Sequence, residues 1–246
     1  MGARKKTSAT HRPVVWVVGA SRGIGREIAK QFASIGCEVC VSSRSSKELG
    51  TLVKEIGTLG GRAYAYPLDI RNRRSISRAI TAIEKQFQAV DVLINNAGVT
   101  VFKSFHATTI SEFDSIIETN LLGPIQCTKG ILSSMLKRKR GWIITILSRA
   151  AVMTFTHSSA YTATKAGMLG MMNVLREEVR ASNIRVVNIL PGPTETKMWS
   201  AASRKKYAAQ MMKPKSVAET VLALYLSPDD VMIEEVVLLP VAGDIK

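Results

Sequence analysis

A short apolar segment near the start of the chain leads into a glycine-rich turn and then into a helical pattern. Residues 13–18 are almost wholly apolar and rich in valine, which predicts a buried parallel strand. Gly19, Gly23 and Gly25 follow at the spacing G-x-x-x-G-x-G, and apolar residues then recur at helical spacing up to Ile35. Of all features in the sequence this order constrains the fold most, because strand, glycine turn and helix build the phosphate-binding unit of dinucleotide folds.

The chemistry of this turn suits a pyrophosphate. Glycine allows the backbone to approach the phosphates closely, and the first turn of a helix offers free N–H groups and a positive dipole end. An ordinary strand–helix turn is the alternative interpretation. On the nucleotide interpretation, the residues expected at the cofactor are Gly19, Ser21, Arg22, Gly23, Ile24 and Gly25.

Strand and helix patterns alternate along the rest of the chain, which predicts one doubly wound parallel sheet with helices on both faces. Residues 1–12 read as a disordered basic tail, 13–246 as a single dinucleotide-binding domain, and about 194–212 as a mobile substrate segment. The predicted strands are 13–18, 37–43, 62–68, 90–94, 142–147, 184–190 and 235–239. Between them we predict helices at 46–59, 75–87, 110–136, 158–181 and 217–226, the last one preceded by Pro214.

Composition bounds the function classes. The 246 residues carry a net charge of +15, with 46% hydrophobic and 22% charged residues, as in a globular protein. The charge raises nucleic-acid binding as an alternative, but the charges are dispersed apart from the tail and a run at 137–140, which reads as a solvated helix end. A positive field would also attract a phosphate-rich cofactor or an acidic carrier protein.

The sequence gives little indication of a targeting segment, a disulfide or a cysteine metal site. No apolar run is long enough for a membrane span, and the basic N-terminal residues do not resemble a secretory signal. Cys37 and Cys40 lie on a predicted strand, where residues three apart face opposite sides, so a shared metal or a disulfide is disfavoured. We therefore expect no metal site, no membrane association and a cytoplasmic location.

The residues after the second strand bear on cofactor choice. An acidic residue at this point would accept the 2′-hydroxyl of NAD, whereas an arginine accommodates the 2′-phosphate of NADP. The sequence has no acid here and carries Arg44, with Arg22 as a second candidate cation. NADP(H) is therefore favoured, although either arginine could be an ordinary solvated side chain.

Other candidate residues follow strand ends, where ligands bind in open α/β sheets. Asp69 and Ile70 follow the third strand, Asn95 to Gly98 the fourth, Ser148 the fifth, and Pro191 to Thr196 the sixth. Asn120 interrupts a long helical pattern, where an asparagine marks a kink or a site.

Tyr161 and Lys165 lie four residues apart in a predicted helix, one turn apart on the same face. A nearby ammonium favours the phenolate, so Lys165 is expected to lower the pKa of Tyr161 from about 10 toward neutrality. Such a phenol can exchange a proton with a substrate oxygen.

Taken together, these motifs resemble those of the classical short-chain dehydrogenase/reductase family, from about Pro13 to Leu239. The shared motifs are the glycine turn, Asp69, Asn95-Asn96-Ala97-Gly98, Asn120, Ser148, Tyr161-x-x-x-Lys165 and Pro191-Gly192. The resemblance implies that Tyr161 is the acid/base, Ser148 binds the substrate oxygen, Lys165 assists both Tyr161 and the nicotinamide ribose, and Asn120 holds a relay water. It also implies cofactor contacts from the glycine turn, Asp69, Ile70, Asn96, Ala97, Gly98, Tyr161, Lys165, Pro191, Gly192, Thr194 and Thr196.

The resemblance also implies a ketone or secondary-alcohol substrate and a homotetramer or homodimer. The pattern around Met198 looks similar to 3-oxoacyl-[acyl-carrier-protein] reductases, whereas the C-terminus looks more like broad-range aldehyde/ketone or hydroxy-acid members. A non-catalytic NADP-binding sensor or scaffold is the competing hypothesis. Arg149 departs from the family pattern: it either faces a substrate carboxylate or phosphate or points to solvent, and the second is the favoured expectation. The expected pocket residues are Val99, Phe102, Ser148, Phe155, His157, Met198 and Trp199.

Overall fold

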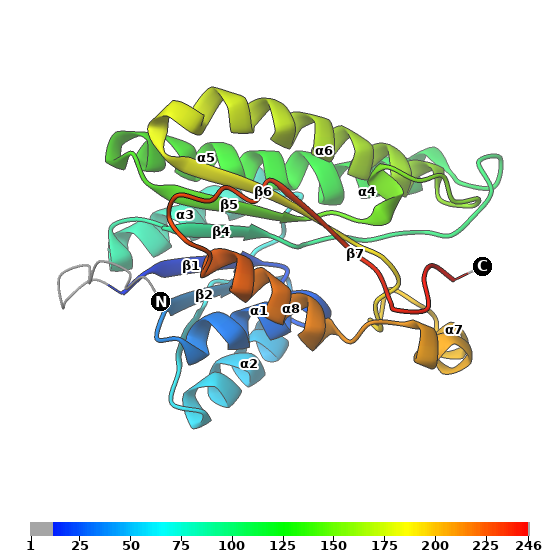
Figure 1. Cartoon of the computed structure of the whole chain (residues 1–246), viewed down its shortest axis with the longest axis horizontal. Coiled ribbons are helices and arrows are strands. Elements are labelled where there is room, and N and C mark those ends of the chain that lie inside the picture. The colour runs from blue at the N-terminus through cyan, green and yellow to red at the C-terminus, as the bar shows by residue number, and fades with distance from the viewer. Residues whose placement is uncertain (1–11, 246) are drawn as a thin grey trace.

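A parallel sheet forms the centre of the protein (Figure 1). The structure, a computed structural model, describes residues 12–245. Within these residues the sheet has seven strands in the order β3-β2-β1-β4-β5-β6-β7. All neighbouring strands pair in parallel. The strands are β1 (Val14–Val18), β2 (Glu38–Ser42), β3 (Arg62–Ala65), β4 (Val92–Asn95), β5 (Gly141–Ile146), β6 (Ile184–Pro191) and β7 (Glu235–Leu238).

Helices cover both faces of this sheet, so the predicted doubly wound Rossmann-like fold is confirmed. On one face lie α3 (Arg73–Phe87), α5 (Gly123–Arg138) and α6 (Ser159–Val179), with α4 (Ile110–Ile117) beside α6. On the other face lie α1 (Gly23–Ser34), α2 (Ser46–Thr58) and α8 (Pro214–Tyr225). A short α7 (Ala201–Tyr207) lies in the predicted substrate segment.

The alternation of strand side chains divides the core in two. Trp16 in β1 packs under α3, α5 and α6, whereas its neighbours Val15 and Val17 pack under α1, α2 and α8. Cys37 and Cys40 likewise pack on opposite faces, as predicted, and both are buried. Burial on both faces explains why the central strands read as continuous apolar runs, whereas the edge strands β3 and β7 are partly exposed.

The long helix predicted over 110–136 is divided. After α4 the chain forms a π-helical turn, Glu118–Leu122, before α5 begins at Gly123. A Cβ on Gly123 would lie 2.7 Å from the carbonyl oxygen of Ile70, so glycine allows α5 to pack directly against the residues that follow β3. π-Helical turns of this kind often occur at functional sites, and this one contains Asn120.

Other boundaries differ by a few residues. β3 ends at Ala65 rather than at residue 68, although the N–H groups of Tyr66 and Leu68 still donate to the carbonyl oxygens of Val41 and Ser43 at 2.9 and 3.0 Å. The predicted basic tail lies outside the described residues except for Arg12. The run at 137–140 ends α5 as expected, but Arg138 and Arg140 pair with the buried Asp91 at 2.7 and 3.1 Å. No helix of residues 12–245 is long and apolar enough to cross a bilayer.

Candidate active site

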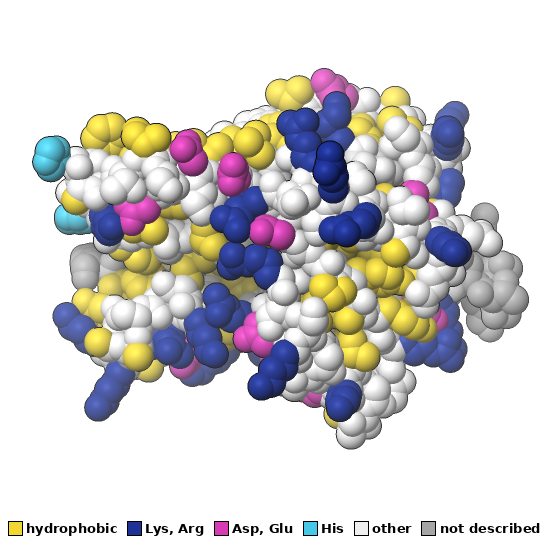
Figure 2. Space-filling view, turned by 180° about the vertical axis from the view of Figure 1, so that it is seen from behind, with side chains coloured by type: hydrophobic (Ala, Val, Ile, Leu, Met, Phe, Trp, Pro, Cys, Tyr) yellow, Lys and Arg dark blue, Asp and Glu magenta, His cyan; other side chains and the backbone are white. Residues whose placement is uncertain are grey.

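The strand order reverses on either side of β1, and a cavity of about 790 Å³ opens at the carboxyl ends of the central strands. Figure 2 shows a hollowed face with hydrophobic side chains inside and Lys and Arg side chains around it. The predicted residues that line the cavity are Gly19, Ser21, Arg22, Gly23, Ile24, Arg44, Asp69, Ile70, Asn96, Ala97, Gly98, Val99, Phe102, Ser148, Phe155, Tyr161, Lys165, Pro191, Gly192, Thr194, Thr196, Met198 and Trp199.

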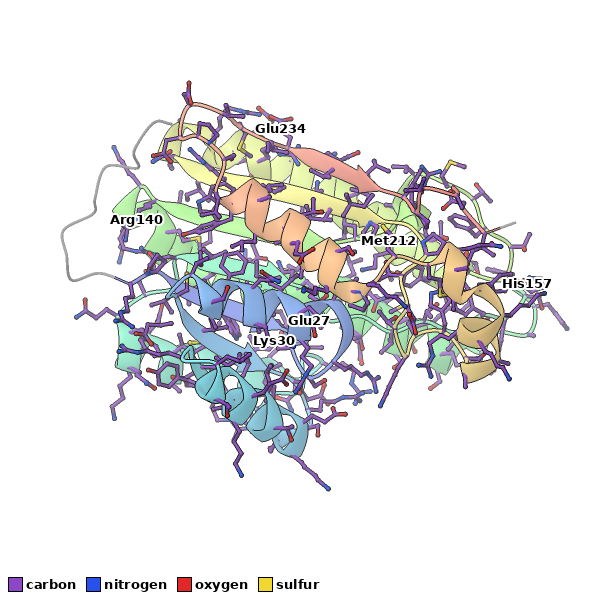
Figure 3. The ribbon with its side chains drawn as sticks, turned by 60° about the horizontal axis from the view of Figure 1, so that its bottom comes forward. Glu27, Lys30, Arg140, His157, Met212 and Glu234 are labelled. Atoms are coloured by element: carbon purple, nitrogen blue, oxygen red, sulfur yellow. The ribbon has the colours of Figure 1, made fainter. Side chains whose placement is uncertain are left out.

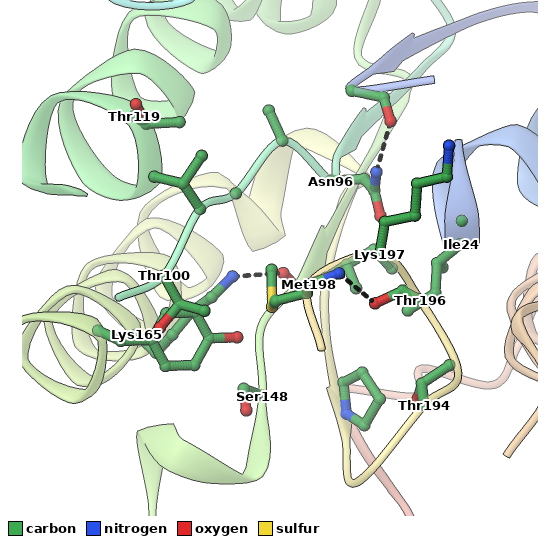
Figure 4. Close-up of a pocket in the computed structure, with 18 of the residues that line it drawn as sticks. Ile24, Asn96, Thr100, Thr119, Ser148, Lys165, Thr194, Thr196, Lys197 and Met198 are labelled. Atoms are coloured by element: carbon green, nitrogen blue, oxygen red, sulfur yellow. Dashed lines mark hydrogen bonds between the residues drawn. The ribbon is translucent and has the colours of Figure 1, made fainter. Parts of the chain in front are cut away.

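The glycine turn is held tightly against the end of β4. Gly19 has a left-handed φ of +90°, and a Cβ there would lie 2.6 Å from the backbone nitrogen of Ala97. The Asn96 amide donates to the Gly19 carbonyl oxygen at 2.8 Å (Figure 4). Gly25 is not on the cavity wall: it lies beneath the turn, where a Cβ would be 2.4 Å from the same carbonyl. The turn and the first N–H groups of α1 thus form a preshaped cradle for phosphate.

Positive side chains stand at the end of the cavity nearest β2 and β3. Arg44 follows β2, Arg22 precedes α1, and both line the cavity. Asp69 forms an ion pair with Arg71 at 3.1 Å. The hydrogen bond that the Arg71 side chain donates holds the pKa of Asp69 below its ordinary value. Arg71 also lines the cavity, and sequence reasoning missed it because it lies beyond the strand end in a turn.

Three polar side chains, those of Ser148, Tyr161 and Lys165, line the same cavity, and Figure 4 labels Ser148 and Lys165 among them. Ser148 follows β5, and its hydroxyl accepts a hydrogen bond from the Ala150 N–H at 3.1 Å. Tyr161 and Lys165 lie one turn apart on α6, and both are buried. The Lys165 ammonium lies 5.6 Å from the centre of the Tyr161 ring and donates to the carbonyl oxygen of Ile146 at 2.9 Å.

The ionisation of these groups differs from the sequence-based expectation. Burial raises the pKa of Tyr161, and a hydrogen bond with Ser148 opposes this rise only in part. Burial also lowers the pKa of Lys165 to about 8. The prediction that Lys165 lowers the pKa of Tyr161 is therefore wrong for this structure, because loss of solvent dominates both groups.

Asn120 lies behind the cavity wall rather than on it. Its side-chain oxygen accepts from the Val99 N–H at 2.8 Å, and its amide donates to the Val99 carbonyl at 2.8 Å. The amide also lies 3.3 Å from the Thr164 hydroxyl. A Cβ on Gly98 would lie 3.6 Å from the Asn120 oxygen and 3.8 Å from the Lys165 nitrogen, so these two groups flank Gly98. Asn120 thereby fixes the segment that follows β4.

Most of the predicted substrate residues form an apolar region of the cavity. The rings of Phe102 and Trp199 face each other with centroids 5.8 Å apart, joining the segment after β4 to the segment after β6. His157 is the exception: its side chain is exposed and does not line the cavity, and its φ of 62° turns the chain just before α6 (Figure 3). The expectation that His157 faces the substrate is therefore not met.

The C-terminal segment supplies cavity residues that the sequence did not reveal. Asp244 and Ile245 line the wall, and Asp244 pairs with Arg149 at 2.9 Å. Arg149 is thus turned to the cavity and not to bulk solvent, since its neighbour Ser148 caps a tight turn that directs it there. No local pattern announces Asp244, because the contact joins segments far apart in the chain.

Sequence comparison agrees with this geometry. Residues 13–207 match the short chain dehydrogenase family, and the chain belongs to that family of oxidoreductases. It is 32% identical over 240 residues to a sepiapterin reductase of Chlorobaculum tepidum, covering 95% of this chain and 98% of that protein. It is 35% identical over 188 residues to a 3-oxoacyl-[acyl-carrier-protein] reductase of Staphylococcus epidermidis, covering 76% and 77% of the two chains.

Solved structures show the same fold. A metagenomic short-chain oxidoreductase in complex with NADP superposes with a TM-score of 0.82 at 32% identity, covering 93% of this chain and 96% of that one. The actinorhodin polyketide ketoreductase with NADPH has a TM-score of 0.87 at 29% identity, covering 95% and 98%. A 7α-hydroxysteroid dehydrogenase with NADH and 7-oxo glycochenodeoxycholic acid has a TM-score of 0.86 at 27% identity, covering 95% of each chain.

Proposed function

We propose that the protein is an NADP(H)-dependent oxidoreductase that interconverts a ketone and a secondary alcohol, with reduction as the physiological direction. The observation that carries this proposal is that Ser148 lines the same cavity as the buried Tyr161 and Lys165 and forms a hydrogen bond with Tyr161. A sensor that only binds a nucleotide does not need a hydroxyl next to a buried phenol and a buried ammonium.

The residues present fit a dinucleotide. The glycine turn and the start of α1 would hold its pyrophosphate, and Arg22 and Arg44 would hold a 2′-phosphate. Two similar structures contain NADP or NADPH, and one contains NADH. The cluster of arginines at this end of the cavity favours the phosphorylated cofactor for this chain. When bound, the reduced nicotinamide supplies the hydride.

The side chains supply the rest of the chemistry. Ser148 and Tyr161 would donate hydrogen bonds to the carbonyl oxygen, where negative charge develops during reduction. The raised pKa of Tyr161 keeps its proton in place at neutral pH, as a general acid requires. Lys165, held by the Ile146 carbonyl, places positive charge beside the phenol that loses this proton.

The substrate belongs to one of two groups. A 3-oxoacyl thioester is favoured by the likeness to 3-oxoacyl-[acyl-carrier-protein] reductases, by the apolar region near Phe102 and Trp199, and by a basic surface that suits an acidic carrier protein. A broad-range aldehyde/ketone or hydroxy-acid substrate is the alternative. A cytoplasmic homotetramer or homodimer completes the proposal.

The test measures cofactor binding and turnover separately. We expect NADPH to bind more tightly than NADH and to be consumed with at least one member of a ketone and 3-oxoacyl thioester panel. Tyr161→Phe should retain NADPH binding and lose turnover by a factor of about a hundred or more. Tight NADPH binding without turnover of any carbonyl would favour the sensor hypothesis, and salt-sensitive binding to DNA would revive the nucleic-acid alternative.

A further inference from the structure

Two oppositely charged side chains meet on the cavity wall next to Ser148. The Arg149 guanidinium lies 2.9 Å from the Asp244 carboxylate, and the side chains retain 18% and 24% of their exposure. Both residues line the same cavity as Tyr161. The pair therefore lies within the space that a substrate would enter.

Arg149 is the fixed member of the pair. It begins a 3₁₀ turn that the Ser148 side chain caps, and its carbonyl accepts hydrogen bonds from the N–H groups of Val152 and Met153 at 3.0 and 2.9 Å. Its Nε is buried and has no hydrogen-bond partner among the described residues. The ion pair joins Nη2 of Arg149 to Oδ2 of Asp244, and Nε takes no part in it, although an arginine can hold a carboxylate with two nitrogens.

Asp244 belongs to the segment that follows β7 and runs to the α7 end of the molecule (Figure 1). A turn closed by the Gly243 N–H and the Pro240 carbonyl at 2.8 Å, with a φ of +83° at Gly243, brings the carboxylate back to the cavity. Its second oxygen is buried without a partner in the described part of the chain. A Cβ on Gly192 would lie 3.2 Å from that oxygen, so the segment rests directly on the cavity wall.

We propose that Arg149 is a specificity residue for substrates that carry a carboxylate near the reacting carbonyl, and that Asp244 occupies its place until such a substrate enters. This inference rests on the proposed ketone reduction and, within it, selects the alternative substrates, oxo acids and hydroxy acids, over the 3-oxoacyl thioesters, which have no carboxylate next to the reacting carbonyl. The unpaired Nε of Arg149 is the donor that the second oxygen of a substrate carboxylate needs. The place now taken by the unpaired oxygen of Asp244 gives that second oxygen its space.

The charge balance of the cavity supports an anion. With Arg22 and Arg44 assigned to the cofactor and Arg71 paired with Asp69, the lining still includes the cations Arg149, Lys165 and Lys197, against the anions Glu48 and Asp244. An incoming carboxylate exchanges with Asp244, so Arg149 stays paired and the released carboxylate returns to water. A neutral substrate leaves the pair intact, and a cationic one meets a positive field.

The test uses matched acids and esters: 2-oxobutanoate, acetoacetate and 4-oxopentanoate, each against its methyl ester, with NADPH. We expect Arg149→Met to lower kcat/KM for the acids by about tenfold to a hundredfold and to leave the esters nearly unchanged. Arg149→Lys should restore part of the loss. Asp244→Asn should lower KM for the acids, since the competing carboxylate is gone. Lys215→Met, which removes one exposed cation on α8, is the control for net charge.

The outcomes separate the inference from the function. Equal effects of Arg149→Met on acids and esters, or weaker acid binding in Asp244→Asn, would show that the pair only fastens the C-terminal segment and would overturn the inference while ketone reduction stands. If no carbonyl is reduced, the proposed function fails. Calorimetric binding of 3-hydroxybutyrate to the protein with NADP⁺ then decides: binding lost in Arg149→Met supports the anion site, and no Arg149-dependent binding overturns it.

Discussion

The Lys165 ammonium donates to the Ile146 carbonyl oxygen at 2.9 Å, tying α6 to the end of β5. Ser148 follows Ile146 by two residues, so one hydrogen bond links the strand that carries Ser148 to the helix that carries Tyr161 and Lys165. This contact holds a buried ammonium in a fixed place, and burial lowers the pKa of Lys165 to about 8.

The first prediction concerns stability against pH. Because the pKa of Lys165 falls from 10.5 in an exposed lysine to about 8 in the fold, the unfolded chain binds more protons between these values. The free energy of unfolding should therefore rise with pH in this window, by up to about 3 kcal/mol relative to Lys165→Met. Denaturant unfolding of both proteins from pH 8 to 10.5 measures the difference. Parallel curves would show that the lysine is not held in a buried, desolvated state.

The second prediction concerns the pH dependence of catalysis. Since the folded protein raises the pKa of Tyr161, alcohol oxidation, which needs the phenolate, should accelerate with rising pH more steeply than ketone reduction. The hydrogen bond with Ser148 lowers this pKa, so Ser148→Ala should move the inflection to higher pH as well as reduce the rate. Profiles of kcat/KM in both directions provide the measurement. An inflection that stays in place in Ser148→Ala would contradict the assigned contact.

The third prediction concerns cofactor choice. Replacing Arg44 by Asp removes a cation for a 2′-phosphate and introduces a carboxylate that repels it, so NADPH affinity should fall about tenfold to a hundredfold. NADH affinity should hold or improve. Fluorescence titration of both cofactors measures the ratio, with Lys47→Asp on the exposed side of α2 as the charge-matched control. If the control shifts the ratio as much as Arg44→Asp, the effect belongs to the general field and not to this side chain.

The fourth prediction concerns the glycine turn. In Gly25→Ala the new methyl group would lie 2.4 Å from the Gly19 carbonyl oxygen and the Asn96 amide, so their hydrogen bond must lengthen. We expect a loss of about 1–3 kcal/mol in stability from overpacking and a clear loss of NADPH affinity. Gly50→Ala is the control, because nothing lies within 4 Å of a Cβ there and alanine favours the helix by roughly 0.5–1 kcal/mol. Equal behaviour of the two variants in thermal melts and cofactor titrations would argue against the close contact.

Local patterns were enough to predict the alternating strands and helices, because burial on both faces of a parallel sheet requires continuous apolar runs and each connecting helix requires its own periodicity. They also predicted the glycine turn and the spacing of Tyr161 and Lys165, since both depend on residues that are near one another in the chain.

Features that depend on contacts between distant segments could not be predicted from the sequence. Burial reversed the expected pKa shift of Tyr161, since the loss of solvent comes from packing that no local pattern records. Asn120 turned out to bond with Val99 behind the wall, and His157 turned out to be exposed. The pairing of Arg149 with Asp244 has the same origin: Coulomb attraction acts through space, and the fold alone brings these two charges together.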